Sequence, residues 1–176
     1  MEPDKPGRLV ENPTFRYFLE EAALWRRTQG AASDVVDAAV QCLLEGVDSP
    51  TFVLIAGLTK AEAEQELHEL LPVALDELGI DCLGYGDPNN DVLAAAAVAR
   101  AFFYGHLEAQ QLAQAVHQTF GHDCHPLVSE LSNLDDSFET LGFNASPSQD
   151  RLVAETHIAA TKLRNKADEI YAGAQQ

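Results

Sequence analysis

Basic residues and long apolar runs are what this chain has least of. Its 176 residues include 11 Lys and Arg against 28 Asp and Glu, which gives a formal net charge of −17. So few cations argue against direct binding of nucleic acid, because phosphate binding depends on clustered Lys and Arg side chains. The longest apolar runs, such as residues 92–99, fall far short of the ~20 residues that a membrane span needs. We therefore expect neither nucleic acid nor a membrane as a direct partner.

Cysteine is also scarce. The three cysteines, Cys42, Cys82 and Cys124, are widely spaced and odd in number. This pattern argues against a framework of disulfides and fits a reducing compartment. The first turns of the chain carry several acids and no apolar segment of the kind found in secretion signals. These features together predict a cytoplasmic protein.

Enough apolar material is present for a folded domain. Hydrophobic residues make up 46% of the chain, which is sufficient for a core at this length. With charged residues at 22%, the composition excludes a disordered acidic tail. The length itself fits one domain.

Apolar residues recur at helical spacing almost throughout, and Gly, Pro and capping residues divide the pattern into about seven or eight helices. We predict an all-α, single-domain helical bundle over residues 12–176, preceded by a flexible N-terminus over residues 1–11. Residues 91–104 form an Ala-rich run that is apolar on nearly all sides. We expect this helix near the centre of the bundle.

Local signals predict several helix boundaries. Residues 59–62, Thr-x-x-Glu, form a capping-box sequence ahead of a long amphipathic run. Pro72 lies inside that run and predicts a kink or a break. Either Ser33 or Asp34 is expected to cap the second helix. Residues 52–55, Phe-Val-Leu-Ile, suit a strand by propensity, but the flanking Ser-Pro and Gly favour a short helix.

The acids are concentrated in the middle of the chain. From residue 61 to residue 150 there are 16 Asp and Glu and a single basic residue, Arg100. On a helical wheel of the run that follows residue 59, the acids that face away from the leucines are Glu62, Glu66, Glu69 and Asp76. This face is either a solvated surface or a docking surface for a basic protein, including a nuclease whose nucleic-acid cleft the acids would fill. No calcium-binding loop accompanies the acids.

The densest group of metal-ligating side chains is a short run made of His122, Asp123, Cys124 and His125. We expect this run to be a loop, because Gly121 ends one helix and Pro126 starts the next. Its two histidines and its aspartate, together with His117, would supply the ligands of a metal-dependent enzyme. The structural alternative is a loop histidine that caps a helix. Cys124 beside a histidine is a further hypothetical nucleophile, but no residue that would orient the pair can be named.

Three segments carry a resemblance to known proteins. They are Gly-Val-Asp-Ser-Pro at residues 46–50, Ala-Gly-Leu-Thr at residues 56–59 with Glu62 and Ala63, and Leu-Leu-Pro-Val-Ala-Leu-Asp-Glu-Leu-Gly at residues 70–79. Over about residues 35–121 the chain resembles a loose group of uncharacterised small helical bacterial proteins. The shared residues are mostly caps, core positions and helix ends, so the resemblance implies a helical fold and carries no activity.

These patterns favour a non-catalytic, acidic protein-binding module without a cofactor. Its concrete form would be an immunity or inhibitor type of protein that neutralises a basic effector protein. The binding residues would be Glu62, Glu66, Glu69 and Asp76, acting as steering charges. Two alternatives stay open: the metal-dependent enzyme, with ligands His122, Asp123 and His125, and a helical bundle that binds a small apolar ligand.

Overall fold

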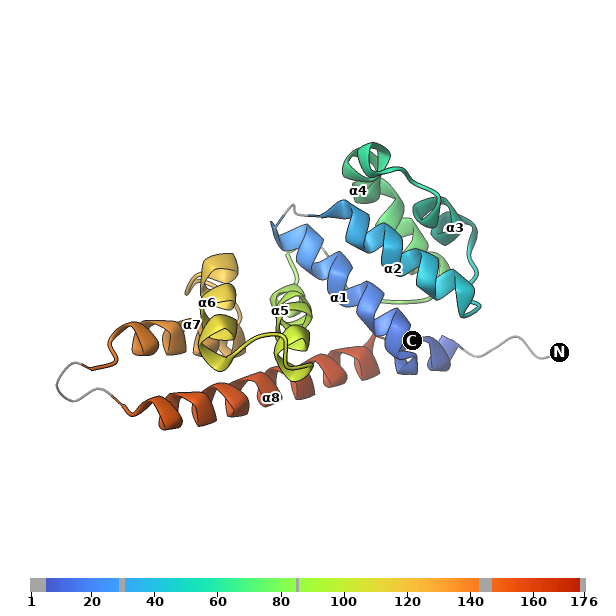
Figure 1. Ribbon diagram of the computed structural model, residues 1–176. Coiled ribbons are helices and arrows are strands. Elements are labelled where there is room, and N and C mark those ends of the chain that lie inside the picture. Colours follow the sequence, from blue (N-terminus) through green and yellow to red (C-terminus); the bar gives the residue numbers. More distant parts are fainter. Residues whose placement is uncertain (1–5, 29–30, 85, 143–146, 175–176) are drawn as a thin grey trace.

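The computed structural model describes residues 6–28, 31–84, 86–142 and 147–174 of the chain. Within these ranges the chain forms eight α-helices, one short 3-10 helix and no strand, which confirms the predicted all-α helical bundle. None of these helices combines the length and the apolar character that crossing a membrane requires. In chain order the elements are η1 (Pro6–Glu11), α1 (Pro13–Thr28), α2 (Ala32–Leu44), α3 (Pro50–Ala56), α4 (Lys60–Glu77), α5 (Asn89–Phe103), α6 (Ala109–Phe120), α7 (Pro126–Glu139) and α8 (Gln149–Gly173) (Figure 1).

Helix α5 lies at the centre of the bundle, as its apolar character predicts. It contacts α1 from the first half of the chain and α6, α7 and α8 from the second half. The long helix α8 runs beneath α5, α6 and α7, while α2, α3 and α4 gather at the opposite end of the molecule (Figure 1). The two ends meet where α1 packs against α5.

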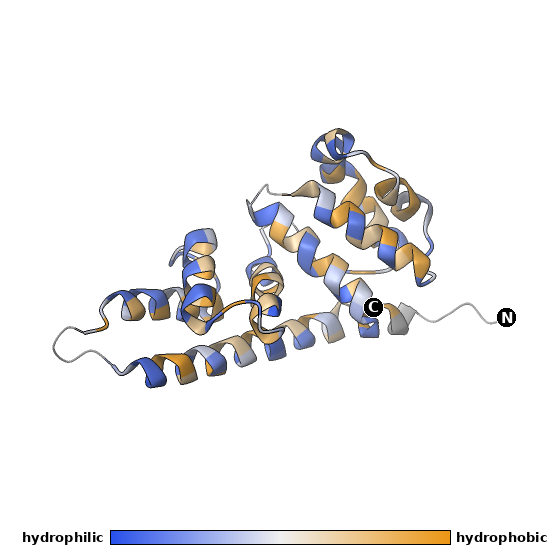
Figure 2. Cartoon of the chain, viewed as in Figure 1, coloured by the Kyte–Doolittle hydropathy of each residue, from blue (hydrophilic) through white to orange (hydrophobic). Residues whose placement is uncertain are grey.

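One continuous hydrophobic core joins all eight helices. Hydrophobic residues line the sides of the helices that face one another, while hydrophilic residues point outward (Figure 2). Phe15 and Phe18 of α1 meet Phe52 of α3, with ring centroids 6.3 and 4.8 Å from that of Phe52. Four consecutive buried alanines, residues 94–97, present small side chains on α5. Small side chains of this kind allow neighbouring helices to approach closely.

Local capping signals explain where several helices begin. Residues Thr59 and Glu62 form the predicted capping box, since the Thr59 backbone N–H donates to Glu62 Oε2 (2.8 Å) and the Glu62 N–H donates to Thr59 Oγ1 (3.4 Å). Ser49 Oγ accepts the backbone N–H of Phe52 (3.2 Å) at the start of α3. This cap makes residues 52–55 helical, so the strand alternative is wrong and the short helix is confirmed.

The start of α2 and the break at Pro72 differ from the sequence predictions. Helix α2 begins at Ala32, and its N-cap is Ala31, which makes no side-chain capping hydrogen bond. The predicted caps Ser33 and Asp34 therefore lie inside the first turn. At Pro72 the predicted break is wrong, since helix α4 continues through the proline with buried residues on both sides of it, while the predicted kink stays a prediction.

The N-terminal segment packs earlier than the predicted domain start at residue 12. Residues Pro6–Glu11 form η1, which contacts α1 and α8. Val10 is buried, and its carbonyl oxygen accepts a hydrogen bond from Arg16 Nε (2.5 Å). The remainder of the predicted flexible segment, residues 1–5, lies outside the described ranges.

Arg100 of α5 ties three helices together in a mostly buried polar network. Its guanidinium forms ion pairs with Glu20 (2.5 Å) and Glu21 of α1 and lies over the ring of Tyr17, 4.1 Å from its centroid. The Tyr171 hydroxyl of α8 donates to Glu20 Oε1 (2.9 Å). Burial raises the pKa of both glutamates, and the Arg100 charge opposes that rise. The network therefore stabilises the fold only while all of its charges are present.

Replacing Arg100 with Met should lower the free energy of unfolding by about 3 kcal/mol near pH 7, because two largely buried carboxylates lose their partner. The raised pKa values mean that Glu20 and Glu21 bind protons more tightly in the folded chain than in the unfolded chain. Their ionised carboxylates therefore destabilise the folded state more as the pH rises. Without Arg100 these pKa values rise further. The loss measured by urea unfolding should therefore be smaller near pH 5 than near pH 7.

A matched control is Arg151→Met, which removes an exposed arginine that pairs with Glu155 at 2.7 Å. This change should alter the stability by no more than about 0.5 kcal/mol. Equal losses in the two variants, or a loss in Arg100→Met that does not depend on pH, would contradict the assigned role of the network.

Candidate functional site

The outer side of α4 carries a row of acids. Glu62, Glu66, Glu69 and Asp76 are all exposed, and we call these four residues the acidic face. At 100° per residue their spacing places them on one side of the helix, opposite the buried side chains of Ala63, Leu67, Leu71 and Ala74. Glu62 also closes the capping box, and the hydrogen bonds from Thr59 lower the pKa of its carboxyl. The predicted arrangement of these side chains is thus what the structure contains.

The acidic face has no cationic partner within the described ranges. No salt bridge there involves any of its four carboxylates, and six cations of those ranges pair with other acids. The pairs are Arg16 with Asp168, Arg27 with Asp91, Arg100 with Glu20 and Glu21, Arg151 with Glu155, Lys162 with Glu130, and Lys166 with Glu169. Neither end of the chain, as far as it is described, folds back to neutralise α4.

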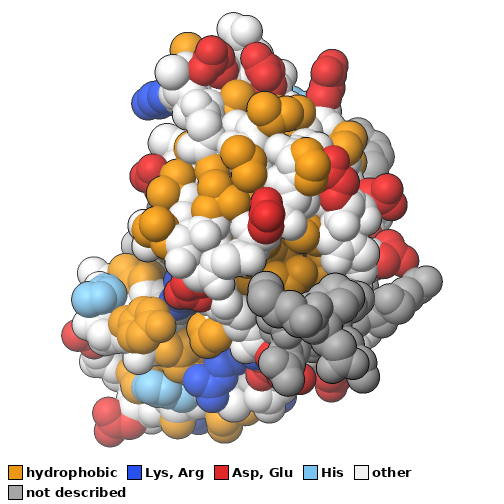
Figure 3. All heavy atoms as spheres, turned by 90° about the vertical axis from the view of Figure 1, so that its right-hand side faces the viewer, with side chains coloured by type: hydrophobic (Ala, Val, Ile, Leu, Met, Phe, Trp, Pro, Cys, Tyr) orange, Lys and Arg blue, Asp and Glu red, His pale blue; other side chains and the backbone are white. Residues whose placement is uncertain are grey.

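Exposed apolar side chains accompany the acids. Val73 lies on the same side of α4 as the acidic face and is 49% exposed. On the adjacent α3, Val53 and Leu54 are 47% and 58% exposed. Figure 3 looks onto this end of the molecule, where hydrophobic side chains form patches among Asp and Glu side chains. An apolar area bordered by charges is typical of a protein-binding surface.

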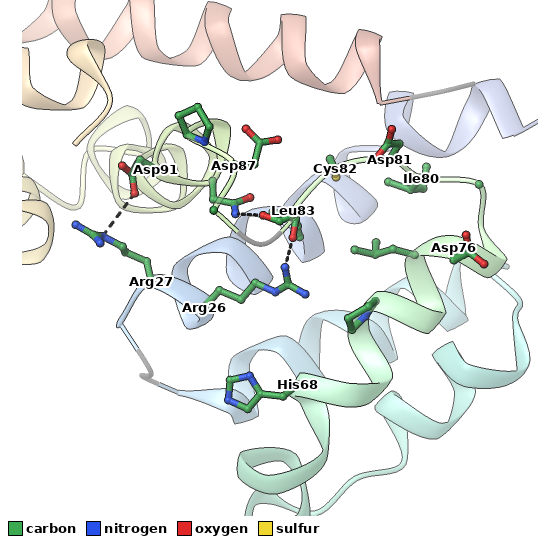
Figure 4. Close-up of a pocket in the computed structure, with 17 residues that line it drawn as sticks. Arg26, Arg27, His68, Asp76, Ile80, Asp81, Cys82, Leu83, Asp87 and Asp91 are labelled. Carbon is green, nitrogen blue, oxygen red and sulfur yellow. Dashed lines mark hydrogen bonds and ion pairs between the residues drawn. The ribbon is translucent and has the colours of Figure 1, made fainter. Parts of the chain in front are cut away.

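A pocket of about 990 Å³ adjoins the acidic face at Asp76. Its walls come from α1, α4, the segment that follows α4, and the start of α5 (Figure 4). The charged side chains that line it are Arg26, Arg27, Asp76, Asp81, Asp87 and Asp91. Carboxylates outnumber guanidinium groups in this lining, so the pocket continues the acidic character of α4.

The two arginines of the pocket hold its walls in place. Arg26 Nη1 donates to the carbonyl oxygen of Leu83, a buried residue with a left-handed φ of 63°. Left-handed φ is unfavourable for a residue with a branched side chain, so this bond helps to fix the turn. Arg27 Nε lies 3.5 Å from Asp91 Oδ1, and its Nη2 donates to the carbonyl oxygen of Phe120 (3.3 Å). Figure 4 shows the contact of Arg26 with Leu83 and that of Arg27 with Asp91 as dashed lines.

A second pocket, of about 760 Å³, lies where α1, α5 and α8 meet. Its lining includes Arg16, Arg100, Arg164, Glu20 and Asp168. Sites for small apolar ligands are lined mainly by apolar and aromatic side chains with few polar groups. The second pocket also has apolar and aromatic side chains, among them Phe103, Tyr104 and Tyr171, so the small apolar ligand stays a prediction for that pocket.

The predicted metal ligands do not come together as a set. His125 is the N-cap of α7: its Nδ1 accepts the backbone N–H of Leu127 (3.2 Å), and its own backbone N–H donates to Asp91 Oδ2 (3.2 Å). Among the described residues, neither Asp123 nor His125 belongs to a group of three side chains able to hold a metal ion. The structure therefore does not bring His122, Asp123 and His125 into one ligand group, and the Nδ1 of His125 is used to cap α7.

A different group of ligands surrounds His122. Its Nε2 lies 3.5 Å from Asp136 Oδ2, and its ring centroid lies 4.6 Å from that of His117. One ligand atom from each of His117, His122 and Asp136 lies within 4.8 Å of the others. The sequence predicts His117 as a ligand but not Asp136, because α6 and α7 cross at an angle (Figure 1). If α6 and α7 ran side by side as an antiparallel pair, His117 in the last turn of α6 would lie beside the first turn of α7. Asp136 is in the third turn of α7.

The cysteines have the surroundings of unreactive thiols. Burial raises the pKa of Cys42 and of Cys82 to about 12. Burial also raises the pKa of Cys124, and nearby Asp91 adds to the rise. A nucleophilic cysteine needs a lowered pKa, so this result argues against Cys124 as a nucleophile.

Comparison of the chain with the models of known protein families, with curated proteins and with solved structures found no match. The features of the chain that bear on its function are therefore the acidic face, its apolar neighbours and the adjoining pocket.

The thiol pKa values predict the labelling behaviour of the folded protein. At about pH 8 the thiolate populations of Cys42 and Cys82 should be about 10³-fold below that of an unperturbed thiol. Iodoacetamide should therefore leave both residues unmodified in the folded protein and alkylate both after unfolding in urea, as counted by mass spectrometry of peptides. Rapid alkylation of Cys82 in the folded state would show that its thiol is exposed and ionised.

Proposed function

We propose that this chain is a non-catalytic protein-binding module that docks a basic protein on the acidic face of α4. The observation that carries the proposal is that Glu66, Glu69 and Asp76 are exposed and form no ion pair within the described ranges. Unmatched charges of one sign create a field that speeds the arrival of an oppositely charged partner. These three carboxylates therefore act mainly on the rate of association.

The apolar side chains supply the short-range part of the interface. Val73 lies between the acids on α4, and Val53 and Leu54 extend the apolar area onto α3. Burial of such side chains against a partner is favourable, at roughly 25 cal/mol per Å² of apolar surface. Charges at the rim with apolar contacts at the centre are the usual composition of a transient interface.

The same charges determine what kind of partner fits. A second copy of this chain would bring like charges face to face, and such juxtaposition is repulsive. A partner with Lys and Arg side chains would instead meet the acids, and one cationic side chain could enter the pocket beside Asp76. The concrete form of the proposal is an immunity or inhibitor type of protein that covers the working surface of a basic effector protein.

Reversal of three charges tests the proposal. The variant Glu66→Lys, Glu69→Lys, Asp76→Lys leaves Glu62 in place, because Glu62 also holds the capping box. Proteins captured by the wild type from the native cell would be identified by mass spectrometry, and the captured partner would then be measured by stopped flow. Association with the variant should be at least about tenfold slower at low salt, with a weaker dependence on ionic strength.

The matched control reverses three exposed acids that lie away from α4, in the variant Asp123→Lys, Glu139→Lys, Asp150→Lys. Both variants change the net charge of the chain equally. Retention of partner binding by the control and its loss in the α4 variant is the expected result. If the α4 variant associates at the rate of the control, the acidic face is not the docking surface.

The substitution Val73→Ser tests the apolar contribution separately. Because Val73 is 49% exposed, the free energy of unfolding should change by no more than about 0.5 kcal/mol. The rate of dissociation from the partner should rise several-fold, while the association rate stays the same. An unchanged dissociation rate would place Val73 outside the interface.

A further inference from the structure

The cluster around His122 lies at the end of the molecule that the proposed interface does not use. His117 is in the last turn of α6, His122 is in the segment between α6 and α7, and Asp136 is in the third turn of α7. One ligand atom from each lies within 4.8 Å of the other two. Their side chains are 29%, 47% and 51% exposed, so an ion could reach them from solvent. From this arrangement we propose that His117, His122 and Asp136 bind one zinc ion.

The geometry is close to that of a bound ion. Two ligands that are each ~2.0–2.1 Å from a tetrahedral zinc lie roughly 3.3 Å apart. His122 Nε2 and Asp136 Oδ2 are 3.5 Å apart, which is near that value. The ligand atom of His117 lies within 4.8 Å of the other two, so the side chains must rotate toward one another to reach that value. Two imidazoles and one carboxylate suit zinc, and the fourth position of the ion stays open to water.

Asp135 positions one of the ligands. Its side chain is 9% exposed, and its Oδ2 lies 2.9 Å from His117 Nδ1. A carboxylate that binds one nitrogen of an imidazole fixes the orientation of the ring and leaves the other nitrogen for the metal. Asp136 Oδ1 lies 3.6 Å from the same nitrogen of His117. Asp135 is therefore the nearer partner of Nδ1, and Asp136, which also faces His122, is the ligand of the pair.

A zinc ion here would tie the end of α6, the segment that follows it and the middle of α7 to one point. The carboxylates and histidines around the site come from these same elements. Within the described ranges none of these carboxylates forms an ion pair with a Lys or an Arg. The local charge is therefore negative before the ion binds, which favours a cation. Binding of an ion by the folded chain alone also raises its stability.

The test uses the full chain without a polyhistidine tag, stripped with a chelator and titrated with Zn²⁺ in competition with a chromophoric chelator. The wild type should bind one ion per chain, and Zn²⁺ should raise its Tm. The variants His122→Ala and Asp136→Asn, both at exposed positions, should fold normally and bind Zn²⁺ at least about 100-fold more weakly, without the rise in Tm. Asp135→Asn should keep the stoichiometry and weaken binding by about 10–100-fold.

His106→Ala is the control, because it removes an exposed histidine outside the cluster. It should bind Zn²⁺ with the affinity of the wild type. Equal Zn²⁺ affinity in the wild type and in His122→Ala would overturn the assignment. Weak binding of several ions per chain, unchanged in Asp136→Asn, would overturn it too. Failure of the wild type to bind Zn²⁺ would overturn it as well, and none of these results bears on the docking surface of α4.

Discussion

The ion pairs of Arg100 are the constraint on which the rest of this molecule depends. Arg100 extends from the central helix α5 to Glu20 and Glu21 of α1, and Glu20 in turn accepts the hydroxyl of Tyr171 from α8. Arg100 is also the single basic residue between residues 61 and 150. Because that cation is used inside the bundle, the acids of this stretch have no cation of their own at the surface. The same contact thus joins the two ends of the fold and leaves α4 with unmatched charge.

Much of the fold follows from signals that act within a few residues. The capping box at Thr59 and Glu62 and the cap at Ser49 each depend on atoms three residues apart, so the sequence alone places them. The start of α2 at Ala32 shows the limit of this reasoning, because packing of the buried Ala32 and Val35 decides it without a capping side chain. Tertiary packing overrides local preference where the two differ.

Of the candidate sites, one follows from signals within a single helix and the others depend on how helices pack together. The acidic face could be predicted because its members repeat at helical spacing on one element, α4. The pairing of His122 with Asp136 could not, since it depends on the angle at which α6 crosses α7. The pocket beside Asp76 was equally hidden, because its walls depend on a left-handed turn at Leu83 that Arg26 holds from another helix.

The arrangement of the helices also separates two kinds of recognition. The acidic face lies on α4 at one end of the molecule, and the histidine cluster lies on α6 and α7 at the other, with α1 and α5 packed between them (Figure 1). Coupling between distant sites requires an element with two alternative arrangements that both ligands bias. The elements between these sites are helices with tightly packed apolar sides, which resist rearrangement. A protein partner would therefore recognise the charge of α4 independently of an ion that pins α6 to α7.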